Sequence, residues 1–184
     1  MDKIYKFFWA TRAVFYKLFF GGFLLPGYIG KPKFLMNPKR IRIGRRVRIF
    51  PGMRAECHGD GRLIIGDNVS IGQDFHVIAS GDLYIGRGCL ISANVFVTDT
   101  DHTFDNIGVP VFEQPNKTSL TCIGENCFLG IGVRIQAGTK LGKGCIVGAN
   151  SVVRGDFPDH CMIVGAPARI VKRYDFVSGQ WQRC

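Results

Sequence analysis

Aliphatic side chains recur at every sixth residue over most of the chain. The repeat begins near residue 41, breaks briefly at residues 55–62 and for longer at residues 101–120, and then resumes. Its members are Ile43, Ile49, Ile65, Ile71, Val77, Ile85, Ile91, Val97, Ile123, Leu129, Ile135, Leu141, Val147 and Val153. A period of six fits neither an α-helix nor a plain alternating strand. It fits a short strand followed by a tight turn, and the glycine that often follows the aliphatic residue supplies turn dihedrals that other residues resist.

Three such units predict one triangular coil, and successive coils stack about 4.8 Å apart through strand-to-strand hydrogen bonds. A hexapeptide period is a signature of parallel β-helices. We therefore expect an all-β fold, a parallel β-helix of about five coils over residues 41–172. Residues 1–40 would precede it as a separate N-terminal segment, and residues 173–184 would follow it as a tail.

The longer interruption, a protruding loop near residues 101–120, is polar and contains a histidine. His102 lies among three carboxylates, Asp99, Asp101 and Asp105. Insertions from a rigid coil are where such scaffolds place functional loops. An imidazole can accept a proton at neutral pH, and a nearby carboxylate can fix its tautomer. His102 is therefore the candidate functional residue, and any of the three aspartates could orient it.

The N-terminal segment concentrates the positive charge. Residues 1–55 contain thirteen bases and one acid, a formal charge of +12, whereas the remaining residues contain eleven bases and thirteen acids, a charge of −2. Aromatic residues and lysines fall on opposite sides at helical spacing, which predicts an amphipathic helix. The charge-free run of residues 18–30 is shorter than the roughly 20 residues that span a bilayer, and no convincing signal-peptide cleavage site follows. The chain also lacks a groove-reading motif or stacking platform, so we expect no nucleic-acid partner.

Two roles for this segment stay open. Its apolar face and its bases could bind an anionic membrane surface, which would place the protein peripherally on the cytoplasmic face of the inner membrane. The helix could instead pack against the body of the protein. The seven cysteines, odd in number and without a CxxC pair, favour a reducing cytoplasm. Cys127 and Cys145 are one coil apart, so we expect them to stack in the core as small apolar residues.

The repeat resembles the hexapeptide-repeat, left-handed β-helix acetyltransferases, in particular those that modify bacterial surface polysaccharides and the galactoside acetyltransferases. The most specific match is Thr98-Asp99-Thr100-Asp101-His102, followed by Asp105, Pro110 and Gln114. The resemblance implies acetyl-CoA as co-substrate and His102 as the catalytic base. It also implies a left-handed coil and a homotrimer with active sites between subunits.

The resemblance extends to the residues that would bind coenzyme A. Those in the later coils and the closing segment are Phe128, Gly130, Ile131, Ala149, Arg154, Arg169 and Lys172. Phe128 stands where relatives usually have tryptophan, and Ile131 stands where galactoside acetyltransferases have serine, so only its backbone could act similarly. The three bases suit a cofactor rich in phosphate.

The resemblance leads us to expect an acetyl-CoA-dependent O-acetyltransferase acting on a sugar hydroxyl of a surface-polysaccharide precursor, free or lipid-linked. Two alternatives stay open, an N-acetyltransferase for a nucleotide-linked amino sugar and a non-catalytic β-helix scaffold. The same fold also hosts zinc carbonic anhydrases, which use three histidines, two of them five residues apart. Ile107 stands where the second of that pair would be, so no metal is expected.

Overall fold

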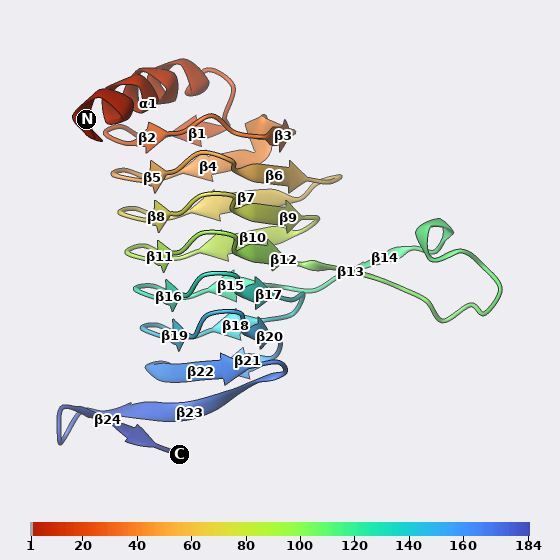
Figure 1. Cartoon of the computed structure of the whole chain (residues 1–184). Coiled ribbons are helices and arrows are strands. Elements are labelled where there is room, and N and C mark those ends of the chain that lie inside the picture. The colour runs from red at the N-terminus through yellow and green to blue at the C-terminus, as the bar shows by residue number, and fades with distance from the viewer. Residues whose placement is uncertain (1) are drawn as a thin grey trace.

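The computed structural model describes residues 2–184, with side chains from residue 4 onward. Three sheets wind together into a column of stacked coils, with a helix over the N-terminal end and a hairpin at the C-terminal end (Figure 1). Strands that neighbour each other within a sheet come from successive coils and pair in parallel. The predicted parallel β-helix is confirmed.

The three sheets are named here by the order in which the chain visits them. The first sheet contains β1 (Gly22–Phe23), β4 (Ile41–Ile43), β7 (Arg62–Ile65), β10 (Asp82–Ile85), β15 (Cys122–Ile123), β18 (Lys140–Leu141) and β21 (Asp156–Phe157). The second sheet contains β2 (Tyr28–Ile29), β5 (Arg48–Ile49), β8 (Ser70–Ile71), β11 (Leu90–Ile91), β16 (Phe128–Leu129), β19 (Ile146–Val147) and β22 (Cys161–Gly165), extended by antiparallel β23 (Ala168–Asp175) and β24 (Gln180–Arg183). The third sheet contains β3 (Phe34–Met36), β6 (Arg54–Cys57), β9 (His76–Ala79), β12 (Phe96–Thr98), β17 (Arg134–Ile135) and β20 (Val152–Val153).

The core consists of columns of aliphatic side chains, one from each coil. In the first sheet Ile43, Ile65, Ile85, Ile123 and Leu141 are paired in register. Each of them is no more than 2% exposed. Burying such a side chain stabilises the fold by roughly 1.5–3 kcal/mol. The six-residue period therefore reflects the requirement that every strand contribute one residue to a continuous core.

The column has seven coils in residues 22–165, where about five were expected from residue 41 onward. The additional coil at the start lies within the predicted N-terminal segment. Its residues Phe23, Ile29 and Leu35 keep the six-residue spacing and pair with the next coil. These apolar residues form the first coil and shield the side chains of the next coil, which begins with β4, from solvent.

Helix α1 (Asp2–Tyr16) packs across the N-terminal end of the column. The Trp9 ring contacts the rings of Tyr28 and Phe50, with centroid distances of 5.7 Å and 5.4 Å, and Ala13 is completely buried. One face of the predicted amphipathic helix is thus used to close the core. Within residues 2–184, no helix combines the length and hydropathy needed to span a bilayer.

The longer interruption forms an arm that projects from the column (Figure 1). Its base is a two-stranded antiparallel ladder of β13 (Thr100–His102) and β14 (Asn116–Thr118), and a short 3₁₀ turn, Val111–Glu113, lies near its tip. Another 3₁₀ turn, Pro38–Arg40, connects the first two coils. The arm confirms the protruding loop near residues 101–120.

The buried cysteines behave as core residues. Cys127 and Cys145 occupy equivalent positions in successive coils and are at most 1% exposed. The Cys127 thiol donates to the carbonyl oxygen of Gly142 at 3.1 Å. All seven cysteines are free, so the fold does not depend on disulfide bonds.

Candidate functional site

Asp99 fastens the base of the arm to the preceding coil. Its carboxylate is 1% exposed and accepts hydrogen bonds from the backbone amides of Ser80 and Gly81, both at 2.8 Å. The Thr100 hydroxyl donates to the same carboxylate at 2.7 Å. A buried carboxylate needs such donors to offset its lost hydration. Asp99 therefore determines where the arm leaves the coil.

The other two aspartates lie in different surroundings. Asp101 accepts a hydrogen bond from Nη2 of Arg154 at 2.6 Å, whereas Asp105 is exposed beyond the ladder. Within residues 4–184, no hydrogen bond connects any of these three carboxylates to the His102 ring. The Asp99 carboxylate binds backbone amides of the coil, and the Asp101 carboxylate binds Arg154. Neither aspartate therefore orients the His102 ring in this structure.

His102 lies at a polar cavity of about 400 Å³ between the arm and the third sheet. The His102 ring is exposed, and Asn116 is its partner in the arm ladder. The cavity is lined by His58, Ile78, Ser80, Phe96, Thr98, Thr100, Asp101, His102, Asn116 and Gln136. Hydroxyl and amide groups predominate among the polar side chains. Such a cavity suits a ligand that carries several hydroxyl groups, because each of these side chains can donate or accept a hydrogen bond.

A buried carboxylate, Glu56, contacts His58, which lines this cavity. Glu56 Oε1 accepts from Nε of Arg54 at 2.5 Å and lies 3.2 Å from Nε2 of His76, while its Oε2 lies 3.4 Å from Nε2 of His58. Burial on its own would raise the pKa of Glu56, but the hydrogen bonds from Arg54 and His76 outweigh it and hold that pKa below its ordinary value. Glu56 thus stays ionised and holds two histidines, of which His58 faces the His102 cavity.

Sequence reasoning missed this cluster. The available signal was the alternation Arg54-Ala55-Glu56-Cys57-His58, which places three polar residues on the same face of one strand. The expected break in the repeat at residues 55–62 begins inside a strand of the third sheet. Strand β6 instead continues the third sheet and pairs with β9.

The predicted donor residues lie at the corner between the second and third sheets. Phe128 and Gly130 belong to one coil and Ala149 to the next, and Ile131 and Ala149 occupy equivalent positions. The coils approach closely here, since a Cβ added at Gly130 would lie 2.7 Å from the Ala149 nitrogen. Phe128 and Ile131 are 37% and 52% exposed, so both are accessible to a ligand.

Two backbone amides at this corner differ in whether their N–H group is free to donate a hydrogen bond to a ligand. The Gly130 amide donates to the carbonyl oxygen of Val147 at 2.8 Å and so belongs to the coil ladder. The Ile131 amide meets no acceptor among the described residues. If a backbone group of this corner binds a negatively charged oxygen, Ile131 is better placed than Gly130.

The three predicted phosphate-binding bases are not gathered at one point. Arg154 follows β20 and pairs with Asp101, while Arg169 and Lys172 lie on β23 at the C-terminal end of the second sheet. Arg169 is exposed, and its Nη1 donates only to the Ala168 carbonyl oxygen at 2.8 Å. Arg169 is therefore free to bind an external anion, whereas Arg154 would first have to leave Asp101.

His102 and the donor corner occupy different corners of the coil. The arm leaves after β12, between the third and first sheets, while Phe128, Ile131 and Ala149 lie between the second and third sheets. One chain therefore does not bring the histidine and the donor residues to the same corner. In residues 4–184, no three His, Cys, Asp or Glu side chains are arranged as a metal site.

Comparison with known proteins identifies the family. Profiles described as bacterial transferase hexapeptide (six repeats) and hexapeptide repeat of succinyl-transferase match residues 123–155 and 62–99. An Escherichia coli K12 protein named as a lipopolysaccharide biosynthesis O-acetyl transferase is 32% identical over 159 residues, covering 83% of this chain and 81% of that protein. The chain belongs to the hexapeptide-repeat acetyltransferase family. The resemblance inferred from the sequence is confirmed, and the protein is an enzyme of the acyltransferase class.

Solved structures share the fold of this acetyltransferase. A variant of AntD, an N-acyltransferase from Bacillus cereus in complex with dTDP and coenzyme A, has a TM-score of 0.76 at 21% identity and covers 90% of each chain. A galactoside acetyltransferase in complex with coenzyme A has a TM-score of 0.56 at 20% identity, covering 89% of this chain and 70% of its own. At these identities the likeness is one of fold.

Proposed function

We propose that the protein transfers an acetyl group from acetyl-CoA to a sugar hydroxyl, with His102 as the general base. The observation that carries this proposal is the position of His102, on an arm that leaves the coil and at a cavity lined by hydroxyl and amide side chains. A non-catalytic scaffold would not need an insertion that presents a histidine at such a cavity.

The proposed reaction is a direct transfer without a covalent enzyme intermediate. His102 removes the proton from the acceptor hydroxyl while that oxygen attacks the thioester carbonyl carbon. The new C–O bond forms, the C–S bond breaks, and the proton on His102 passes to the departing thiolate. The Ile131 amide is available to stabilise the negative charge that develops on the carbonyl oxygen.

The donor site would use the corner between the second and third sheets. Phe128 offers an exposed ring, the small side chain of Ala149 leaves its backbone accessible, and Gly130 allows the coils to approach closely. Arg169 and Lys172, at the C-terminal end, would bind phosphate groups of the cofactor, and guanidinium groups suit such contacts.

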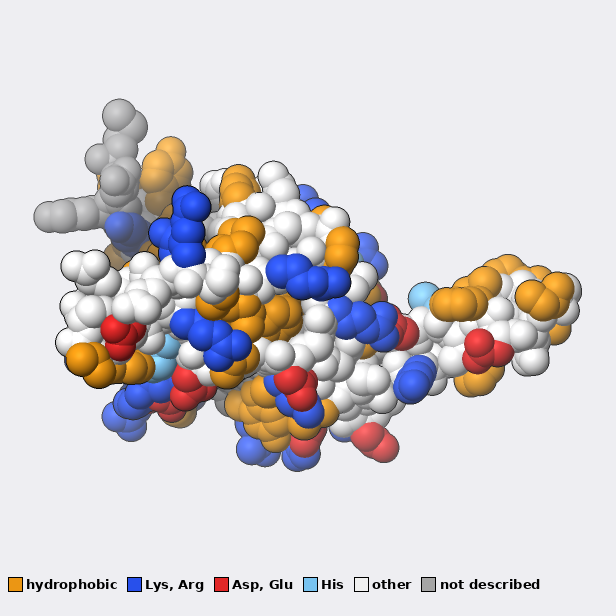
Figure 2. Space-filling view, turned by 90° about the horizontal axis from the view of Figure 1, so that it is seen from below, with side chains coloured by type: hydrophobic (Ala, Val, Ile, Leu, Met, Phe, Trp, Pro, Cys, Tyr) orange, Lys and Arg blue, Asp and Glu red, His pale blue; other side chains and the backbone are white. Residues whose placement is uncertain are grey.

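Because His102 and this corner are apart within one chain, the active site would form between two copies, as in a homotrimer. The tip of the arm supports an intersubunit role. Phe104, Ile107 and Phe112 are 70%, 95% and 82% exposed there. Figure 2 shows hydrophobic side chains gathered at the end of the arm, away from the body of the molecule. An apolar tip of this kind would be stabilised by packing on a neighbouring subunit.

We favour O-acetylation, of a hydroxyl on a surface-polysaccharide precursor, because the relative at 32% identity is named for lipopolysaccharide O-acetylation. The alternative, N-acetylation of a nucleotide-linked amino sugar, is supported by the fold shared with AntD. The two are separated by incubating the enzyme with acetyl-CoA and matched hydroxyl and amino sugars. Mass spectrometry would show which acceptor gains one acetyl group, and alkaline treatment would remove an O-acetyl group selectively.

The base assignment is tested by His102→Ala. We expect kcat to fall by about 10²–10⁴-fold, with coenzyme A affinity unchanged. His160→Asn is the matched control, because His160 lies outside the His102 cavity and has a positive φ of 54° that asparagine tolerates. Near-normal turnover by His102→Ala at saturating substrate would exclude His102 as the base.

We also propose that the outer face of α1 binds an anionic membrane. Beyond the residues that close the core, Phe7, Phe8, Phe15 and Leu18 are 65%, 58%, 59% and 77% exposed. Lys6 and Lys17 are exposed in the same region, and each base near an anionic bilayer contributes about 1 kcal/mol. This location, on the cytoplasmic face of the inner membrane, would bring the enzyme to lipid-linked acceptors.

Point substitutions test membrane binding better than deletion, because removing residues 1–30 would also remove β1 and β2. Replacing Phe7, Phe8 and Leu18 together by asparagine should release the protein from vesicles containing anionic lipid. Coenzyme A affinity should not change. Equal vesicle binding by the variant and the native protein would contradict the proposal.

A further inference from the structure

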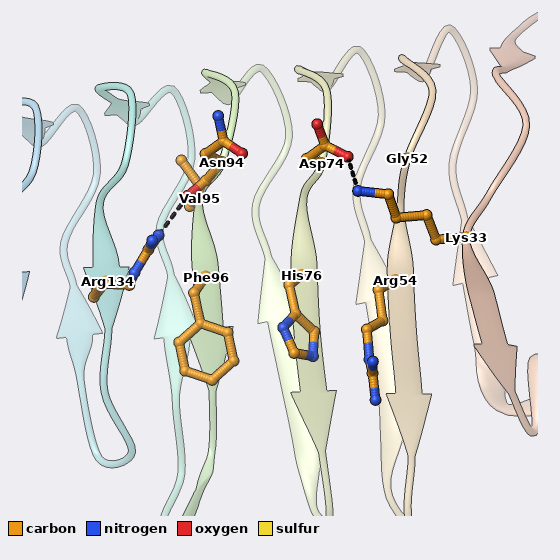
Figure 3. A pocket seen from close by; sticks show the side chains of 9 residues that line it. All are labelled: Lys33, Gly52, Arg54, Asp74, His76, Asn94, Val95, Phe96 and Arg134. Carbon is orange, nitrogen blue, oxygen red and sulfur yellow. Dashed lines mark hydrogen bonds and ion pairs between the residues drawn. The ribbon is translucent and has the colours of Figure 1, made fainter.

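A second cavity, of about 430 Å³, lies on the outer face of the third sheet and is lined by residues from β6 through β17 (Figure 3). One column of side chains crosses it, with each member paired in register with the next strand. In coil order the column is Phe34, Arg54, His76, Phe96 and Arg134. Cations and aromatic rings thus lie side by side on successive coils.

Arg134 gives this cavity an uncompensated positive charge. Its guanidinium donates to the backbone carbonyl oxygens of Asn94 and Val133, and no carboxylate within residues 4–184 pairs with it. The other two bases are paired, Lys33 with Asp74 at 2.5 Å and Arg54 with the buried Glu56. The Arg134 guanidinium therefore has donors left for an external anion, and phosphate oxygens match the geometry of such a fork.

The middle of the column is a pair of rings. The His76 and Phe96 centroids are 5.0 Å apart, with planes inclined by 60°. Arg54 and Arg134 lie on either side of this pair, three coil steps apart, a separation of roughly 14 Å at the usual strand spacing. The arrangement offers an apolar surface for a flat or hydrocarbon group between the Arg54–Glu56 ion pair and the uncompensated Arg134.

This cavity adjoins the cavity at His102. Phe96 lines both of them. Glu56 also connects them, since its carboxylate contacts His76 on one side and His58 on the other. One ligand lying along the outer face of the third sheet can therefore reach from Arg134 to His102.

We propose that this cavity binds the diphosphate of a diphosphate-linked sugar and so places the sugar at His102. The inference rests on the proposed acetyl transfer and specifies its acceptor class. A diphosphate occurs both in nucleotide sugars and in prenyl-linked sugars. Either source presents the same phosphate oxygens to Arg134, and the group beyond the phosphates contacts the His76 and Phe96 rings.

Direct binding tests the proposal without requiring turnover. Titration calorimetry would measure the affinity of the protein for inorganic pyrophosphate, thymidine diphosphate and farnesyl diphosphate. Each titration is made with the donor site saturated by coenzyme A. We expect saturable binding of at least one diphosphate ester, and a loss of about tenfold in affinity for Arg134→Gln, because one charge-assisted contact is removed. Tighter binding of thymidine diphosphate would indicate a nucleotide acceptor, and tighter binding of farnesyl diphosphate a lipid-linked one.

Two variants complete the design. Arg42→Gln is the matched control, since Arg42 is an exposed base of the first sheet on β4, outside the cavity. It should bind diphosphates as the native protein does. Lys33→Gln removes a base at the other end of the cavity and leaves Asp74 uncompensated, so it should also weaken diphosphate binding. It provides an independent answer if Arg134→Gln does not fold.

The proposal is overturned if coenzyme A abolishes diphosphate binding, which would place the anion in the donor site. It is also overturned if Arg134→Gln and Arg42→Gln have equal effects. These results are separable from failure of the proposed function. Acetyl transfer to a neutral oligosaccharide should still require His102 and should be indifferent to Arg134.

Discussion

Asp101 on the arm and Arg154 after β20 are joined by a hydrogen bond of 2.6 Å, although 53 residues separate them in sequence. The bond connects β13 to a coil beyond the point where the repeat resumes. It holds the strand that ends at His102 against the body of the column. Arg154, which the sequence suggested as a phosphate-binding residue, is positioned in the structure to restrain the arm.

Breaking this pair should affect catalysis more than stability. The Arg154 and Asp101 side chains are 59% and 32% exposed, and exposed ion pairs contribute only about 0–1 kcal/mol to stability. We expect Asp101→Asn to lower kcat/KM by about tenfold with little change in Tm, because a small displacement of His102 would weaken the proposed proton transfer. Arg154→Gln should have a similar effect, and the double variant should lose little more.

Asp156→Asn is the control for that pair, since it disrupts the exposed Lys140–Asp156 contact of 3.6 Å on the first sheet, outside the His102 cavity. Its kinetics should match those of the native enzyme. Additive losses in the Asp101 and Arg154 double variant would show that the two residues act separately.

Glu56→Gln should destabilise the protein at pH 7 by about 2 kcal/mol, because the charged acceptor of Arg54 and His76 is lost. The pH dependence follows from the lowered pKa of Glu56, whose ordinary value is 4.5. A carboxylate with a depressed pKa stabilises the fold above its unfolded-state pKa, and the stabilisation is lost as pH falls through the folded-state pKa. The difference in unfolding free energy between the native protein and Glu56→Gln should therefore shrink below about pH 4.5. Urea denaturation at several pH values measures it, and a constant difference down to pH 3 would contradict this account.

Trp9→Ala should lower the unfolding free energy by about 2 kcal/mol, since the indole packs on Tyr28 and Phe50 at the end of the core. Phe8→Ala is the matched comparison on the same helix. Phe8 is 58% exposed, so its loss should change stability by less than about 0.5 kcal/mol while weakening binding to anionic vesicles. Equal Tm shifts for the two variants would mean that α1 is not the cap of the column.

Subunit mixing tests the proposed intersubunit site. His102→Ala lacks the proposed base, and Ala149→Trp should block the proposed donor corner without disturbing the core, because Ala149 is exposed. Each variant alone should be inactive. Random trimers refolded from equal amounts should recover up to about a quarter of native activity, since one interface in four then combines an intact base with an intact donor corner. No recovery in trimers of confirmed mixed composition would place both parts within one subunit.

The repeat itself was predictable because every coil buries one aliphatic residue per sheet, and this requirement is local in sequence. The first coil was not recognised, although Phe23, Ile29 and Leu35 keep the spacing. The surrounding aromatic residues also fit a helix, and α1 in fact ends at Tyr16. Local periodicity alone cannot separate a helix that caps a column from a coil that begins it.

The candidate site was predictable only in part. His102 stood out because it interrupts the repeat. The contacts of Glu56 with His76 and of Asp99 with Ser80 join different coils, and they depend on how many residues each turn contains. Connections in this chain vary in length, so the sequence does not indicate which polar residues come to lie above one another. Because the connections vary in length, the column that includes Arg54 and Arg134 could not be predicted from the sequence either.

The pairing of Ile85 with Ile123 shows how little the arm disturbs the coil that carries it. The first sheet continues in register across the insertion, just as the second sheet does where Leu90 pairs with Phe128. Arm and column can therefore diverge independently. Exchanging residues 103–115 for the arm of a relative, while keeping Asp99 and the ladder, would change the proposed intersubunit contacts of the arm tip and leave the lining of the His102 cavity and the scaffold intact. The β-helix can therefore keep its structure while the arm it carries changes in sequence.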